Sequence, residues 1–185
     1  MDNREQLKQV ALELFYEREY DGVGIQQIVD IAKLTKPTLY YYFGSKQGLY
    51  ASLFRDVLEE DFRLLKDAGN YSGNFSNSLQ NLVFAFARCF EANPKLYSIL
   101  FRFYLAGSSG EAYAVARPYL DRLFGIFLGL FQAARAQLGN MHGREEQFAH
   151  TCLAVVVDYL FRNKDSISEG NLYELLRQYQ FGIYS

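Results

Sequence analysis

The sequence has no tryptophan, and its 185 residues include only three prolines and two cysteines. Two cysteines cannot form a disulfide framework or a cysteine-rich metal site, so we expect a reduced, cytoplasmic protein. The N-terminus, MDNREQLKQV, lacks the apolar core of a signal peptide. The most apolar uncharged run, residues 123–134, is twelve residues long, whereas a membrane-spanning helix needs about 20. These absences argue against a membrane protein.

Motifs of common enzyme classes are also absent. The sequence has no Gly-x-Ser-x-Gly element, Walker loop or dinucleotide fingerprint. Its two histidines, His142 and His150, are not spaced with carboxylates as metal ligands usually are. We therefore expect no enzymatic activity, no cofactor and no metal site. A helical enzyme without a recognisable catalytic motif is the alternative left by default.

The residues that are present predict an all-α fold. There are 16 phenylalanines and 15 tyrosines to bury, and the apolar positions recur at helical spacing without the alternation typical of strands. About nine helices are expected, with loops at 68–78 and 107–110 and late helices at 111–138, 144–163 and 168–181. A capping box formed by Ser166 and Glu169 is expected before the last helix.

Residues 22–46 predict a helix-turn-helix. Two short helices are joined by Lys33-Leu34-Thr35, so the second helix can stand out from the body and enter a major groove. The net charge of the chain is only −2, which means that nucleic-acid contact must come from a local patch. Such a patch exists, because residues 31–55 contain four basic residues and no acidic one.

Residues 35–49 read TKPTLYYYFGSKQGL, and this stretch resembles the DNA-binding domain of TetR-type transcriptional regulators. The resemblance covers about residues 3–58. It implies a three-helix DNA-binding domain at 1–48, followed by a helical effector-binding and dimerisation domain at 49–185. It also implies a repressor that a small apolar or aromatic ligand releases from a palindromic operator. The alternative is an effector-free dimer that only occupies DNA.

The resemblance assigns DNA contacts by position. It implies base contacts for Lys36 and Pro37 at the start of the recognition helix, and packing on bases for Tyr41. Phosphate contacts are implied for Thr35, Thr38, Tyr40, Tyr42 and Lys46, while Lys33 would add charge beside the DNA. Packing is the alternative role for Tyr40 and Tyr42. Leu39 and Phe43 are expected on the buried face.

The chain departs from the family pattern at three places. Lys33 stands where glycine is usual and a left-handed backbone is often needed, at a cost of about 1–2 kcal/mol. Val23-Gly24 stands where Thr-Ser normally caps the second helix, so that cap is expected to be missing or supplied otherwise. Pro37 has no N–H, so its contact with DNA must be apolar or by shape.

The last two helices are the predicted dimer surface, because they carry more apolar residues than one face can bury. The residues assigned to it are Phe148, Cys152, Val155, Val156, Tyr159, Leu172, Leu175, Leu176 and Tyr179. Dimerisation would place two recognition helices on half-sites one helical turn, or a multiple of it, apart. The alternative is that these side chains complete the core of the monomer.

Aromatic residues concentrated in the middle helices predict an effector pocket. The residues assigned to it are Phe62, Phe86, Phe90, Tyr97, Phe101, Tyr104, Phe124, Phe127 and Phe131. Gly125 and Gly129 interrupt one of these helices and would either open room for a ligand or allow close helix approach. An ordinary aromatic core is the alternative. If a ligand binds, the helix that begins at Lys46 is the expected link to the DNA-binding segment.

Overall fold

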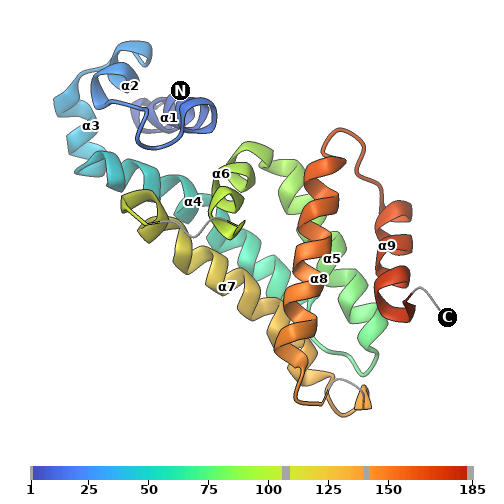
Figure 1. Ribbon diagram of the computed structural model, residues 1–185. Helices are drawn as coiled ribbons and strands as arrows, with labels where there is room; N and C mark the ends of the chain where they lie inside the picture. The colour runs from blue at the N-terminus through green and yellow to red at the C-terminus, as the bar shows by residue number, and fades with distance from the viewer. Residues whose placement is uncertain (1, 106–108, 140–141, 183–185) are drawn as a thin grey trace. The chain divides into compact units, whose positions relative to one another are not determined.

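The protein is described from a computed structural model, which covers residues 2–105, 109–139 and 142–182. Within these ranges the structure is all-α, with nine helices and no strand, as predicted (Figure 1). The helices are α1 (Asn3–Arg18), α2 (Ile25–Ile31), α3 (Lys36–Phe43), α4 (Lys46–Ala68), α5 (Phe75–Ala92), α6 (Pro94–Leu105), α7 (Glu111–Ala133), α8 (Glu145–Arg162) and α9 (Glu169–Phe181). No helix within the described ranges is long and apolar enough to cross a membrane.

Three predicted helix ends were wrong. Helix α5 begins at Phe75 rather than after Ser78, because the Asn74 side chain accepts a hydrogen bond from the Asn77 amide at 3.1 Å and caps the helix inside the polar segment. Helix α7 ends at Ala133 rather than near Leu138. The cap of α9 is Ser168, not Ser166, and it accepts a hydrogen bond from the Asn171 amide at 3.2 Å.

Packing divides the chain into two compact units. Unit 1 comprises residues 1–59 and 93–120, and unit 2 comprises residues 60–92 and 121–185. In unit 1, helix α1 contacts α2, α3 and α6, and Leu7, Phe15 and Leu39 are fully buried. The functional boundary predicted after residue 48 stays a prediction, since these units are defined by packing alone.

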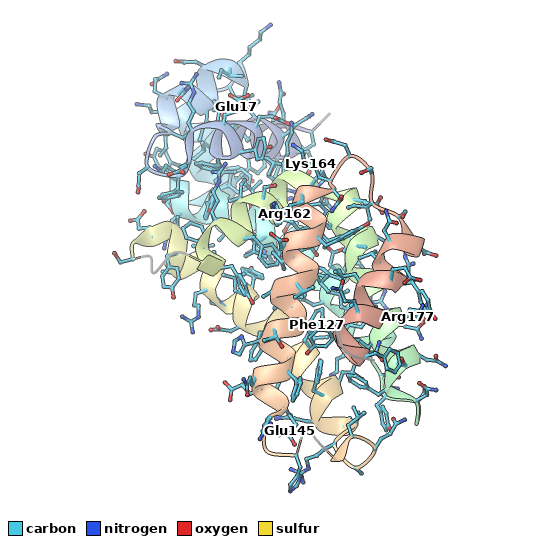
Figure 2. All side chains as sticks on the ribbon, turned by 45° about the vertical axis from the view of Figure 1, so that its right-hand side comes forward. Glu17, Phe127, Glu145, Arg162, Lys164 and Arg177 are labelled. Carbon is cyan, nitrogen blue, oxygen red and sulfur yellow. The ribbon has the colours of Figure 1, made fainter. Side chains whose placement is uncertain are left out.

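Unit 2 is held together by aromatic contacts between its helices. The Phe86 and Phe127 rings meet edge to face at 6.0 Å, and Phe75 meets Phe131 in the same way at 5.0 Å. Phe127, which Figure 2 labels on α7, is fully buried. Helices α5, α8 and α9 contact one another in this unit. Such edge-to-face pairs stabilise a core beyond the area that they bury.

The cysteines and His150 take part in packing. Burial raises the pKa of Cys152 to about 12, and burial together with Asp61 raises that of Cys89 to about 12. Both thiols are therefore protonated at neutral pH and poor nucleophiles. His150 stacks on Phe124 with 3.8 Å between ring centroids. In the part of the chain that the structure describes, no group of acidic, histidine and cysteine side chains could hold a metal ion.

Gly125 and Gly129 on α7 were expected to open room for a ligand or to allow close helix approach, and the structure supports neither role within the chain. Both are exposed, and a Cβ atom added at either would meet no atom within 4 Å. Neither close helix approach nor the lining of a buried cavity within the chain explains these glycines.

Replacing Gly125 and Gly129 by alanine is therefore expected to stabilise the protein, each by up to about 1 kcal/mol. Urea unfolding of the single and double variants measures the free energy of unfolding. Gly44→Ala is the matched control and should destabilise, because Gly44 has a φ of +73° that alanine adopts poorly. A loss of stability in Gly125→Ala would show that another surface covers this side of α7.

Candidate nucleic-acid interface

The turn between α2 and α3 has the backbone that the sequence predicts. Lys33 has a φ of +53°, the left-handed conformation expected at this glycine-favouring position. Helix α2 begins after Gly24 without a side-chain cap, as expected from Val23-Gly24. Helix α3 has an N-terminal side-chain cap, because Thr35 Oγ1 accepts a hydrogen bond from the Thr38 amide at 3.4 Å. Pro37 occupies the first turn of α3, where an N–H is not needed.

Helix α3 has one buried face and one exposed face. Leu39 is fully buried, as predicted, whereas 83% of Tyr41 and 47% of Tyr40 are exposed. Lys36 and Pro37 are also exposed. Two exposed tyrosines beside an exposed lysine offer ring faces, hydroxyl groups and a positive charge on one short helix. Packing therefore does not account for Tyr40, and Tyr41 is available to a partner.

Two further side chains of α3 are half-buried. Tyr42 lies between neighbouring rings, with centroids 5.1 Å from Tyr41 and 6.1 Å from Phe43. Phe43 was expected on the buried face but is only half-buried, and the Arg4 guanidinium lies 5.7 Å from its ring centroid. The hydroxyl oxygens of Thr35 and Thr38 lie 2.8 Å apart. Phosphate contacts by Tyr42 and the two threonines stay predictions.

Lys46 has a structural role that the sequence did not indicate. Its ammonium group donates hydrogen bonds to the backbone oxygens of Tyr20, at 2.8 Å, and Val23, at 2.9 Å. It also lies 4.0 Å from the centroid of the Tyr20 ring, within cation–π range. Lys46 thus ties the loop between α1 and α2 to the start of α4. Its predicted contact with a DNA phosphate would have to use the remaining N–H.

Two of the four basic residues in the segment 31–55 already interact with other groups of the chain. Lys46 donates hydrogen bonds to backbone oxygens, and Arg55 lies 3.5 Å from the Asp56 carboxylate. The exposed cations around the α2–α3 turn are Lys33 and Lys36. Ile31, which we did not predict as a site residue, is 54% exposed at the end of α2. Ile31 lies outside the apolar stripe of α2, and this position in the sequence could have indicated an exposed side chain.

Replacing Lys33 by glutamine is expected to weaken DNA binding equally for all sequences and to reduce the slope of log affinity against log salt by about 1 for each DNA-bound copy of the chain, as the loss of one phosphate-neutralising cation per copy would. Titration of labelled duplexes over a range of salt concentrations measures this slope. Lys164→Gln, at the lysine of unit 2 labelled in Figure 2, is the control and should leave the slope unchanged. An unchanged slope for Lys33→Gln would remove Lys33 from the interface.

The predicted dimer residues fall into two groups. Cys152, Val156, Leu172 and Leu176 are buried within the chain, so they complete the core of unit 2 and cannot face a second subunit. Helical periodicity could not distinguish these cases, because both kinds of burial require the same apolar stripe.

The other five are accessible to different degrees. Val155 is 38% exposed, and Phe148, Tyr159, Leu175 and Tyr179 are half-buried. The Tyr179 hydroxyl donates to the Phe148 backbone oxygen at 2.6 Å, which joins α9 to α8. Tyr159 and Leu175 line an open groove of about 560 Å³ together with Phe181, which is 61% exposed. The Tyr159 hydroxyl is buried, and no hydrogen-bond partner for it is found in the part of the chain that the structure describes.

The residues predicted to line an effector pocket are divided between the two units. In unit 2 they are buried rings, apart from the half-buried Phe124. In unit 1, Tyr97 and Phe101 are buried and stacked with centroids 6.3 Å apart, and Tyr104 is half-buried. Burial of this kind fits a core and a closed pocket equally, so ligand binding at these rings stays a prediction.

Comparisons with known proteins agree with this geometry. Residues 8–53 match the family described as bacterial regulatory proteins, tetR family. The transcriptional activator FasR of Mycolicibacterium smegmatis is 29% identical over 100 residues, which make up 54% of this chain and 46% of FasR. The chain therefore aligns with less than half the length of this relative.

Solved structures resemble the whole chain. The TetR-family transcriptional regulator PfmR of Thermus thermophilus has a TM-score of 0.77 and 18% identity, and the match covers 100% of this chain and 99% of PfmR. FadR of Bacillus subtilis, solved in complex with stearoyl-CoA, has a TM-score of 0.73 and 16% identity, covering 97% and 99%. At these identities the similarity establishes the fold.

Proposed function

We propose that this chain, a member of the tetR family of bacterial regulatory proteins, is a transcriptional regulator that binds a palindromic operator as a homodimer. The observation that carries the proposal is the exposed face of α3, where Lys36, Tyr40 and Tyr41 are accessible and the buried Leu39 holds the helix in place. Ammonium and phenol groups on the exposed face of such a helix suit contacts to base edges and phosphates in a major groove.

Dimerisation is proposed through the groove on α8 and α9. One recognition helix contacts too few base pairs for useful specificity, and two-fold pairing doubles the site. The exposed side chains of Phe181 and Val155 are apolar surface that a second subunit could cover.

The proposed regulation is release from DNA by a small apolar or aromatic molecule. The buried rings of both units supply apolar surface of the kind that lines such sites. FadR, which shares the fold, was solved with stearoyl-CoA, so long acyl chains belong among the compounds tested. A ligand can release DNA only by favouring a conformation that binds DNA less well.

Selection of bound duplexes from a random pool tests the proposal. Enrichment of an inverted repeat with half-sites about 10 base pairs or a multiple of it apart is the expected result. A lone half-site would contradict dimeric binding, and no enrichment would contradict specific DNA binding. A reporter gene placed behind the selected operator should be repressed by the protein. Higher expression would instead identify an activator.

A titration of the selected operator tests regulation. Apolar, aromatic and acyl compounds are added to the preformed complex, and DNA release is followed by fluorescence anisotropy of the labelled duplex. Release by at least one compound class is expected. If none releases the operator, the protein is better described as the effector-free dimer.

A further inference from the structure

Unit 1 contains a cavity of about 200 Å³ that the proposed function does not use. It lies against the end of α1 and the loop that follows, with further walls from α4, α6 and the start of α7, all within unit 1. A dry cavity of about 150 Å³ in another protein holds a benzene molecule. This cavity therefore has room for one aromatic ring with a short side chain.

Aromatic rings form much of its wall. Phe15, Tyr20 and Tyr50 are all buried and line the cavity. The ring centroids of Tyr20 and Tyr50 are 4.9 Å apart, and those of Phe15 and Tyr50 are 5.0 Å apart. Ring faces attract a cation as well as apolar surface.

The charged groups around the cavity are mainly acidic. Glu19, Asp21 and Glu111 line it and are exposed at its edge. Among the described lining residues the cation is Arg102, which donates hydrogen bonds to the backbone oxygens of Phe15, at 3.0 Å, and Tyr16. Its charge is thus directed at the end of α1, where helix carbonyls accumulate. The Lys46 ammonium group, 4.0 Å from the centroid of the Tyr20 ring, is held by two backbone oxygens. The three lining carboxylates therefore outnumber these two cations, both of which are engaged with backbone oxygens, and this balance favours a cation over an anion in the cavity.

Glu111 is the carboxylate best placed to hold a ligand. The Tyr20 hydroxyl donates to it at 2.7 Å, which fixes its position at the cavity wall. Burial and the Glu111 carboxylate raise the pKa of Tyr20, so the phenol remains a donor at neutral pH. The carboxylate keeps further lone pairs for a second donor.

We propose that this cavity is a binding site for a small organic cation, a primary amine attached to one aromatic ring. The ring would enter between the aromatic walls, and the ammonium group would meet Glu111 at the edge. Rings provide apolar contact and cation–π attraction, while a carboxylate pairs with the ammonium group. The site requires neither DNA nor a second subunit, so its test is independent of the proposed function.

Calorimetric titration of the full chain with 2-phenylethylamine and with 2-phenylethanol, its neutral analogue of similar size, tests the proposal. The amine should bind at least about tenfold more tightly than the alcohol, the ratio that one charge-assisted hydrogen bond supplies. Equal affinities, or no binding of either compound, would overturn the proposal.

Two variants locate the site. Glu111→Gln keeps an oxygen that can accept from Tyr20 but removes the charge, and it should abolish the preference for the amine. Glu146→Gln, a matched change in the first turn of α8, should leave the preference intact. Asp21→Asn, at an exposed loop position, should reduce the preference for the amine. It provides the test if Glu111→Gln does not fold. A preference that survives both cavity variants, or that is lost equally in Glu146→Gln, would overturn the proposal.

Discussion

Replacing Tyr41 by alanine is expected to abolish operator-specific binding while leaving the free energy of unfolding within about 0.5 kcal/mol of the original value. The side chain is 83% exposed, so its removal takes little from the core. Loss of an aromatic contact with bases costs about 1–3 kcal/mol per recognition helix. A dimer that uses two such helices would lose that amount twice.

Fluorescence anisotropy with the selected operator, at fixed salt, measures the loss for Tyr41→Ala. Urea unfolding of the same protein measures its stability. Leu64→Ala is the matched control, because Leu64 is an exposed side chain on α4, 44% accessible, in unit 2 and outside the groove on α8 and α9. It should bind the operator normally. Unchanged operator affinity in Tyr41→Ala would remove the proposed base contact and weaken the whole assignment of α3.

Replacing Gly48 by alanine should damage the DNA-binding segment as a whole. A Cβ atom at this position would lie 2.0 Å from the backbone oxygen of Phe43, the last residue of α3. The obstacle is backbone, so no side-chain rotation relieves it. The turn between α3 and α4, where Ser45 Oγ accepts from the Gly48 amide at 2.9 Å, would have to move.

For Gly48→Ala we expect a loss of about 3 kcal/mol or more in the free energy of unfolding, together with loss of operator binding. Chemical unfolding and operator titration measure the two effects. Gly170→Ala is the control, because a Cβ atom there meets nothing within 4 Å and Gly170 also lies near the start of a helix. Normal stability of Gly48→Ala would mean that the turn accommodates the methyl group.

Tyr41 and Gly48 differ in whether their environment could be predicted from the sequence. The resemblance to TetR-type regulators implied that Tyr41 faces the DNA, and the structure shows an exposed side chain. The steric need for Gly48 was not predicted. It depends on where the Phe43 oxygen lies after the chain turns at Gly44, and no periodicity encodes that position.

The charge of the segment 31–55 could be read from the sequence, but the contacts of its basic side chains could not. The acid-free run was evident in the sequence and suggested four cations for DNA. Folding brings Lys46 to the carbonyls of Tyr20 and Val23, which are more than 20 residues away in sequence. A long-range contact of this kind cannot be inferred from the local pattern, so the sequence did not show that Lys46 also has a structural role.

By itself, the sequence determined the helices and the helix-turn-helix, because both depend on local spacing and on side chains that favour or stop a helix. The resemblance to the family, which usually has glycine at this position, indicated the left-handed backbone at Lys33. Only the tertiary structure decided which apolar residues of α8 and α9 are buried within the chain, and it alone revealed the cavity beside Tyr20 and Glu111. Those features arise where distant segments meet, and an apolar stripe is the same whether its partner is nearby, distant or on another subunit.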